Sequence, residues 1–188
     1  ELEAILSFRD RFVAVDLAGD EIGFPGDLFI DHFRLVRDNG LHITIHAGES
    51  AGAESVWQAI HGLNAERIGH ALSVMTDPSL VKYLVDHKIG IESNITSNTQ
   101  TSSVSDYSRH PLGSFLENGI LATINTDDPG VSDITYDYEI NIAAQKVGLS
   151  AEQIHTARIN SLQIAFLSPT EKDELKANIQ KTNNGYAQ

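Results

Sequence analysis

Four polar clusters follow short apolar runs along the chain, and their residues are of the types that bind metals or move protons. They are Asp16-Leu17-Ala18-Gly19-Asp20-Glu21, His46-Ala47-Gly48-Glu49, Gly69-His70 and Asn125-Thr126-Asp127-Asp128-Pro129. In a barrel of alternating strands and helices, the chemistry lies at the carboxyl ends of the strands, whereas an ordinary core strand runs into a bland turn. The clusters therefore predict part of a metal-dependent enzyme.

The histidine clusters suit zinc and proton transfer. His46 and Glu49 share a turn in which Gly48 permits a tight backbone. A neutral imidazole there is suited to zinc, and a partly desolvated carboxyl holds a proton near neutral pH. The alternative is a polar turn capped by Glu49. An isolated His-x-x-Glu is more often such a turn than a functional site. A lone His70 is likewise more often structural, but its position between the other clusters favours a role in the same site.

Two adjacent carboxylates, Asp127 and Asp128, follow an apolar run. Burying either one unpaired would be costly, and a metal or a hydrogen-bonded ligand would compensate it. The alternative is an exposed Asx turn before Pro129. Gly19 could offer a backbone N–H to a ligand or could simply be a loop glycine, and Ser97-Asn98 could be loop residues. The histidines at positions 42, 61, 87, 110 and 155 are interpreted as structural or surface residues.

Composition excludes several classes of partner and site. The 188 residues carry a formal charge of −13, and the 13 Lys and Arg are dispersed, which argues against nucleic acid as a partner. Without cysteine, a bound metal must use histidine and carboxylate ligands. No apolar run has the length of a membrane span, and no signal peptide is apparent. We therefore expect a cytoplasmic enzyme that does not act on membranes.

One strand–helix pattern repeats along the chain and positions the clusters. The spacing predicts strands at residues 12–15, 43–45, 67–68, 89–93 and 120–124, and helices at 27–39, 53–63, 77–87, 111–118, 134–147, 151–166 and 169–179. Alternating strands and helices predict an α/β fold with a parallel sheet. Short regular units without Gly-x-Gly-x-x-Gly favour a (β/α)8 TIM barrel over an open sheet. We expect residues 1–188 to be the C-terminal portion of one barrel domain, containing only its last five strands.

Two more segments extend the pattern: Arg67-Ile68 precedes Gly69-His70, and Thr96-Ser97-Asn98 follows the fourth strand. Taken in order, these clusters make the chain resemble adenosine deaminases of the bacterial type. The resemblance runs from about Phe12 to Leu175. It implies a (β/α)8 barrel with one Zn²⁺ that hydrolyses adenosine and 2′-deoxyadenosine to inosine and 2′-deoxyinosine plus ammonia, in purine salvage. By the same resemblance, Asp128 binds purine N7 and the backbone of Gly19 donates to N3.

The resemblance also implies a role for each residue nearest the metal. His46 and Asp127 are its zinc ligands, and Glu49 is the acid that protonates purine N1 and so makes C6 electrophilic. His70 orients the zinc-bound water and helps to remove its proton. Zinc lowers the pKa of bound water from about 15.7 to about 7, which permits attack at neutral pH. Glu49 must then stay protonated, which burial and the neighbouring Asp pair would favour.

The sequence departs from the family at the metal site. The family's other two zinc ligands form a His-x-His pair at the end of the first strand, and no His-x-His occurs in these residues. A catalytic zinc normally has three protein ligands. We therefore expect this polypeptide alone to be inactive or nearly so, and the parent protein to be the deaminase. Open sheet edges would favour pairing with the missing N-terminal part of the barrel or self-association.

Two other functions fit the same residues. A related deaminase of adenine or another aminopurine would share the zinc chemistry and differ in the ribose pocket. A non-catalytic partial barrel would keep only the packing of its strand–helix units. Adenylate deamination is less favoured, because the sequence offers no basic phosphate pocket.

Overall fold

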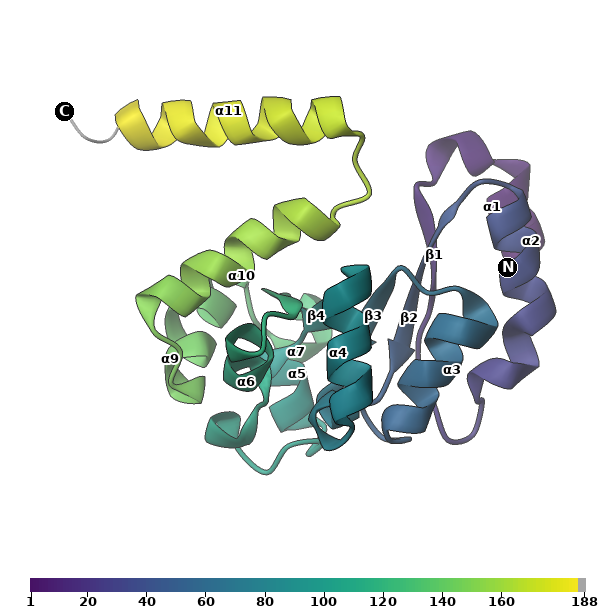
Figure 1. Cartoon of the computed structure of the whole chain (residues 1–188), viewed down its shortest axis with the longest axis horizontal. Helices are drawn as coiled ribbons and strands as arrows, with labels where there is room; N and C mark the ends of the chain where they lie inside the picture. Colours follow the sequence, from purple (N-terminus) through teal and green to yellow (C-terminus); the bar gives the residue numbers. More distant parts are fainter. Residues whose placement is uncertain (186–188) are drawn as a thin grey trace.

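Five strands form one sheet in which every neighbouring pair is parallel and the order in space follows the order in sequence. The computed structural model describes residues 1–185, with side chains described for residues 1–179. The strands are β1 (Ala14–Leu17), β2 (His42–Ala47), β3 (Arg67–His70), β4 (Gly90–Ser93) and β5 (Leu121–Ile124), shown in Figure 1. The fold is the five-stranded parallel portion of a (β/α)8 barrel, as predicted. All five carboxyl ends therefore lie at one edge of the sheet.

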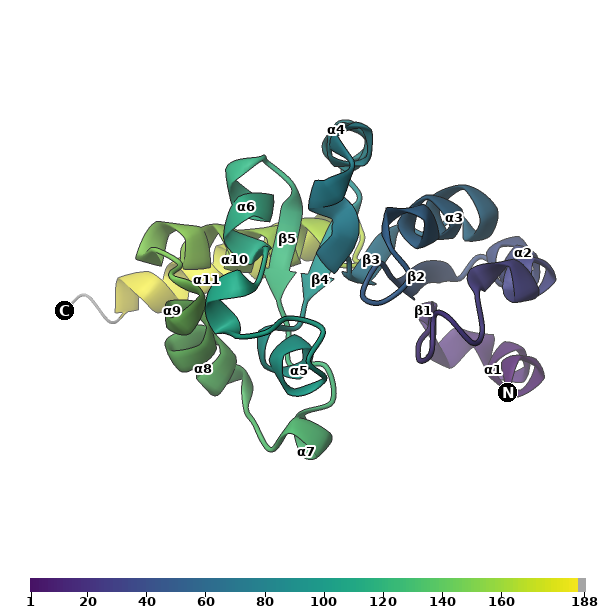
Figure 2. The same ribbon diagram turned by 90° about the horizontal axis from the view of Figure 1, so that it is seen from below.

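Helices connect the strands and cover the sheet. They are α1 (Leu2–Ser7), α2 (Ile30–Asp38), α3 (Ala53–Leu63), α4 (Pro78–His87), α5 (Ile95–Gln100), α6 (Leu112–Glu117), α7 (Pro129–Ser132), α8 (Tyr136–Tyr138), α9 (Ala144–Val147), α10 (Ala151–Ile164) and α11 (Pro169–Gly185). Short 3-10 helices lie at Arg9–Arg11, Gly26–Phe29, Leu72–Thr76 and Tyr107–Arg109, and a π-helical segment at Glu139–Ala143. Figure 2 shows α3, α4 and α6 along one side of the sheet. Within residues 1–185, no helix is both long and apolar enough to span a membrane.

Side-chain caps fix the start of two of these helices. Asp77 accepts hydrogen bonds from the backbone N–H groups of Ser79 and Leu80, and Pro78 occupies the first helical position of α4. Ser150 and Gln153 form a reciprocal capping box at the start of α10. Helix α10 then packs against β5. These local signals explain why the predicted starts of both helices agree with the structure to within one residue.

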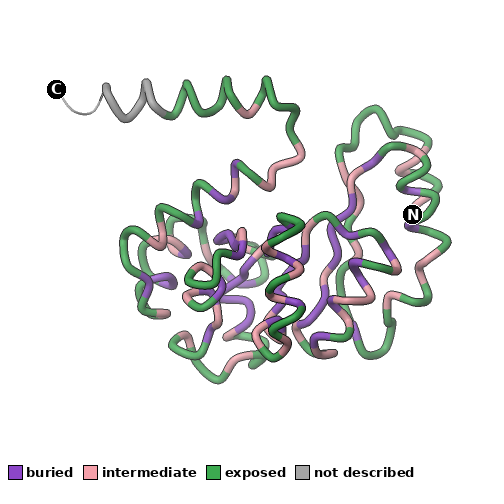
Figure 3. The backbone as a smooth tube through the Cα atoms, in the orientation of Figure 1, coloured by how far each residue is buried: buried purple, intermediate pink, exposed green. Residues whose placement is uncertain are grey.

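The apolar core lies between the sheet and its covering helices, where Figure 3 shows the buried segments. Isoleucines of neighbouring strands meet there, such as Ile45, Ile68 and Ile91, each no more than 2% exposed. The strands also carry polar side chains. Thr44 Oγ1 donates to Glu92 Oε2 at 2.9 Å, and Arg67 forms an ion pair with Glu92 at 3.0 Å. Alternation between apolar and polar side chains is expected of strands with two different faces.

Both outer strands have a single partner among the residues that the structure describes. β1 pairs only with β2, and β5 only with β4. Large apolar side chains before β1 are exposed, with Phe8 at 62% and Val13 at 59%. The predicted open edges are thus confirmed within this region.

Several predicted boundaries differ from the structure. β1 begins two residues later than predicted and runs through Leu17, and β2 and β3 extend through Ala47 and His70. Two polar clusters therefore lie partly inside strands, and Gly69-His70 lies wholly inside β3. The ladder continues there because His46 pairs with Gly69 and Ala47 with His70. The predicted loop after β4 contains α5, which carries Ser97 and Asn98. A π-helical segment interrupts the predicted helix at 134–147.

Candidate active site

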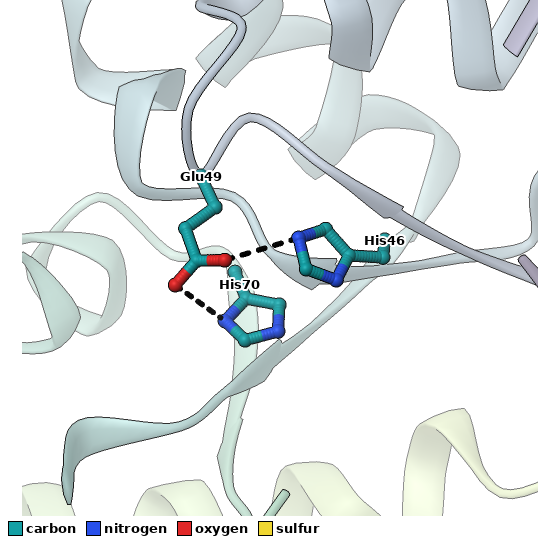
Figure 4. A group of neighbouring side chains, drawn as sticks. All are labelled: His46, Glu49 and His70. Carbon is teal, nitrogen blue, oxygen red and sulfur yellow. Dashed lines mark ion pairs between the residues drawn. The ribbon is translucent and has the colours of Figure 1, made fainter. Parts of the chain in front are cut away.

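A glutamate bridges two histidines at the carboxyl edge of the sheet. His46 lies near the end of β2, His70 is the last residue of β3, and Glu49 lies in the turn after β2. Glu49 Oε2 is 3.1 Å from His46 Nε2, and Glu49 Oε1 is 3.5 Å from His70 Nδ1 (Figure 4). The two imidazole rings lie 4.2 Å apart, centroid to centroid. Three side chains from two of the predicted clusters thus lie together at this edge.

Asp127 joins this group from the loop after β5. Its Oδ2 accepts a hydrogen bond from Ser97 Oγ at 2.7 Å and lies 3.9 Å from His70 Nε2. His46, His70 and Asp127 line a common hollow of about 400 Å³. Ser97 holds the carboxylate from α5, a helix that lies where the sequence predicts a loop.

Two residues of the site have an unusual backbone conformation. His70 has φ of 64° and Asp127 has φ of 55°, which places both in the left-handed region. Such conformations are uncommon for residues other than glycine and cost on the order of 1–3 kcal/mol. They cluster at active sites, where the surrounding structure maintains them. At this edge the conformation occurs at two of the residues predicted for the site, and it also occurs elsewhere, as at Lys88 and Asp133.

Glu21, a residue to which the sequence pattern assigns no role, holds the turn between His46 and Glu49. Its buried carboxylate accepts backbone N–H hydrogen bonds from Gly48 at 3.1 Å, Glu49 at 2.8 Å and Ala51 at 3.0 Å. One of its oxygens also lies 3.2 Å from His46 Nε2. Buried N–H groups need such acceptors, so Glu21 fixes the conformation of the turn.

Replacing Glu21 with alanine should lower the free energy of unfolding by about 2 kcal/mol, the scale of a lost hydrogen bond to a charged group. Denaturant unfolding measures this loss, and hydrogen exchange should show faster exchange at Gly48, Glu49 and Ala51. Asp20→Ala is the matched control, because Asp20 also accepts two backbone N–H bonds but is exposed. Equal destabilisation by the two variants would contradict this role for Glu21.

Electrostatics favour an ionised Glu49. Burial opposes charge on Glu49, but the hydrogen bond from His46, the nearby His70 and the Ser103 hydroxyl outweigh it and hold its pKa at about 2. Burial also opposes charge on His46, yet hydrogen bonds to Glu21 and Glu49 raise its pKa to about 9. The expectation that burial would keep Glu49 protonated is therefore not met. That expectation rested on burial and on the neighbouring Asp pair, and it left out the donors around the carboxylate.

Asn98 on α5 contacts both Glu49 and His70. Its Nδ2 lies 2.6 Å from Glu49 Oε1 and 2.8 Å from His70 Nδ1. Its Oδ1 lies 3.1 Å from Nε2 of His110, which is only 4% exposed. The sequence analysis interprets His110 as a structural or surface residue, and the structure shows a buried structural one that contacts the site through Asn98.

Comparison with known proteins agrees with this arrangement. The family model for adenosine deaminase matches residues 1–182. The chain belongs to the adenosine deaminase family. Adenosine deaminase of Vibrio cholerae O1 is 59% identical over 177 residues, which are 94% of this chain and 53% of that protein. The chain thus spans about half the length of the curated relatives it matches.

Two solved structures related to this adenosine deaminase family member have similar folds. Adenine deaminase from Arthrobacter aurescens is 25% identical, with a TM-score of 0.89. The match covers 97% of this chain and 56% of the adenine deaminase chain. Arabidopsis ADAL, crystallised with IMP, is 26% identical, with a TM-score of 0.82. The match covers 98% of this chain and 54% of the ADAL chain.

The two residues predicted to bind the purine are placed differently. Gly19, with φ of 116°, lines a second hollow of about 470 Å³ that shares His46 with the first. Asp128 is exposed and is not among the residues that line either hollow. The structure therefore brings Gly19 beside the site and leaves Asp128 exposed, outside the lining of both hollows.

Three side chains of the site are close enough to one another to share a metal ion. Ligand atoms of His46, Glu49 and His70 all lie within 4.8 Å of one another. The predicted ligands are His46 and Asp127. This set shares His46 with them, adds Glu49 and His70, and does not include Asp127, which lies beside His70. Nitrogen and carboxylate oxygen are donors that zinc accepts, so the side chains present fit such an ion in their chemistry.

Proposed function

We propose that the whole protein is a zinc-dependent adenosine deaminase that converts adenosine and 2′-deoxyadenosine to inosine and 2′-deoxyinosine plus ammonia, in purine salvage. The observation that carries this proposal is the position of Glu49 between His46 and His70, beside Asp127. The 59% identity to a curated adenosine deaminase supports it. Because the chain spans about half of such relatives, we expect the 188 residues alone to have little or no activity. The cytoplasmic location stays a prediction.

The residues divide into metal ligands and groups that face the purine. His46 and Asp127 would hold the zinc ion, which supplies a Lewis acid and a water that ionises near neutral pH. Glu49 would give a proton to purine N1, and His70 would orient the attacking oxygen. Gly19 and Asp128 would bind N3 and N7. Since Asp128 is exposed and lies outside the lining of both hollows, contact with N7 requires the purine to extend that far.

Glu49 must gain a proton before it can donate one. The hydrogen bond from His46 contributes strongly to the low pKa of Glu49, and it requires a proton on His46 Nε2. A histidine that binds a metal must be neutral, and metal binding releases its proton. Ligation through His46 Nε2 would therefore remove this contribution and raise the pKa of Glu49 toward the range of a general acid.

The proposal is tested by the loss of adenosine absorbance with and without added zinc, on a sample whose intact mass matches these 188 residues. We expect no turnover from this polypeptide, and turnover from a polypeptide extended upstream to a His-x-His strand. Adenine as a parallel substrate distinguishes the alternative aminopurine deaminase. Turnover by the 188 residues alone would show that other residues complete the metal site.

Asp127→Ala should weaken zinc binding by at least the ~10–100-fold that is typical for loss of an outer hydrogen-bond partner of a metal site. The measurement is competition with a chromophoric chelator on the extended polypeptide. Asp133→Ala is a suitable control, because Asp133 is also an exposed aspartate in left-handed conformation but lies after α7. Unchanged zinc affinity in Asp127→Ala would remove Asp127 from the ligand set.

A further inference from the structure

One backbone N–H determines the direction of a chain of hydrogen bonds that ends at His70. The N–H of Leu112 points at Nδ1 of His110, with a nitrogen–nitrogen distance of 3.2 Å. A backbone N–H can only donate, so His110 Nδ1 must carry a lone pair. His110 is therefore neutral, and its proton is on Nε2.

This proton sets the orientation of the Asn98 amide. His110 Nε2–H faces Asn98 Oδ1 at 3.1 Å, which makes the oxygen an acceptor. The two N–H bonds of Nδ2 are then directed to Glu49 Oε1 at 2.6 Å and to His70 Nδ1 at 2.8 Å. The opposite amide orientation would place two N–H donors face to face at His110. Asn98 is fully buried, so water cannot relieve that conflict.

The amide in turn determines which nitrogen of His70 carries hydrogen. Because Asn98 donates to Nδ1, that nitrogen is an acceptor, and neutral His70 has its proton on Nε2. The Glu49 oxygen is also near Nδ1, but at 3.5 Å it is farther than Asn98. Asn94 Nδ2 lies 3.3 Å from Nε2, where it would face this N–H as a second donor. The Asn94 amide therefore takes the opposite orientation, and its oxygen accepts the N–H while no other acceptor occupies the hollow.

We propose that His110 and Asn98 are positioning residues that fix His70 as the Nε2–H tautomer, so that His70 presents an N–H donor to the hollow it shares with Asp127. His70 Nε2 lies 3.9 Å from Asp127 Oδ2 on the side of that hollow. Neutral His70 then orients an attacking oxygen by donating a hydrogen bond and has no lone pair at Nε2 with which to take a proton. Removal of a proton from water, the other role predicted for His70, is therefore not open to this tautomer.

The consequence for catalysis rests on the proposed function, but the tautomer does not. Long-range ¹H–¹⁵N correlation of the imidazole rings in the ¹⁵N-labelled chain, above neutral pH, measures it directly. We expect pyridine-type Nδ1 and pyrrole-type Nε2 shifts for both His70 and His110. His87 is an internal reference of opposite polarity, because its Nδ1 lies 2.9 Å from the carbonyl oxygen of Tyr83. A pyrrole-type Nδ1 at His70 would overturn the proposal.

Asn98→Asp tests the direction of control, since aspartate has the same shape but only acceptor atoms when ionised. The new carboxylate would lie 2.6 Å from Glu49 Oε1, so Glu49 then holds a proton and donates it to the aspartate. We expect the His70 shifts to exchange, with Nδ1 becoming pyrrole-type and Nε2 pyridine-type. His110→Phe should release the Asn98 amide and give averaged His70 shifts, whereas His110→Gln can restore the donor to Asn98. Asn118→Asp, at an exposed amide beyond α6, is the control for a local change of charge. Unchanged His70 shifts in folded Asn98→Asp would refute the relay.

The readouts separate this inference from the function on which its consequence rests. Substrate and metal are not needed for the imidazole spectra, so a polypeptide without turnover still decides the tautomer. If a variant does not fold, the spectrum of the unmodified chain decides alone. Absence of deaminase activity in the extended polypeptide, with His70 observed as Nε2–H, would refute the proposed function and leave the relay intact.

Discussion

Replacing Glu49 with glutamine is expected to lower kcat of the whole deaminase by about 10²–10⁴-fold, the usual contribution of a positioned general acid. Glutamine keeps the length of the side chain but has no acidic proton for purine N1. Glu49 lies within 3.5 Å of both histidines, so its carboxyl group is already positioned in the site. Steady-state deamination of adenosine measures the effect, and we expect KM to change far less than kcat.

The matched control for this prediction is Glu152→Gln. Glu152 is an exposed glutamate in the first turn of α10, away from the carboxyl edge of the sheet. Both variants lose one negative charge, so a general charge effect would appear in both. A decrease of less than about 10-fold in kcat for Glu49→Gln would be too small for an essential general acid.

The fold was predictable because apolar runs recur at strand–helix spacing. Ile43, Ile45 and Ile124 are buried in the sheet where their runs predict strands. Strand ends were harder to predict, because His46 and His70 are polar and yet continue their strands. A search for apolar runs stops at such residues, whereas the parallel ladder includes them. Residues proposed to carry the chemistry thus make the ends of β2 and β3 difficult to predict from apolar runs.

The site was predictable only where its residues form short motifs. His46 and Glu49 are three positions apart, and their types and spacing by themselves suggest chemistry. The carboxylate of Glu21 instead reaches the backbone of Gly48, 27 positions away, and Asn98 reaches His70 across 28 positions. Spacing along one sequence contains no signal for such contacts. They depend on how the loops after β1, β2 and β4 meet at one edge.

Acidification should destabilise the folded chain in part through His110. Burial, with a smaller contribution from the nearby His70, lowers the pKa of His110 to about 4 from an ordinary value of 6.5. Between these values the unfolded chain binds a proton at this position and the folded chain does not. The contribution of neutral His110 to the free energy of unfolding is therefore fully present above pH 6.5 and is lost as the pH falls toward 4. At about 1.4 kcal/mol per pH unit, the loss is roughly 3 kcal/mol.

His110→Gln should remove this share of the pH dependence, because glutamine does not titrate but can still bond to Asn98. The measurement is the free energy of unfolding in denaturant across this pH range, compared between the variant and the unmodified chain. His155→Gln is the control: His155 is exposed on α10, so folding does not remove its side chain from water. The difference between His110→Gln and the unmodified chain should grow as the pH falls, since only the unmodified chain must keep a neutral imidazole buried. A constant difference from pH 6.5 to 4 would mean that His110 is protonated without penalty, and the backbone N–H of Leu112 would then face a second donor.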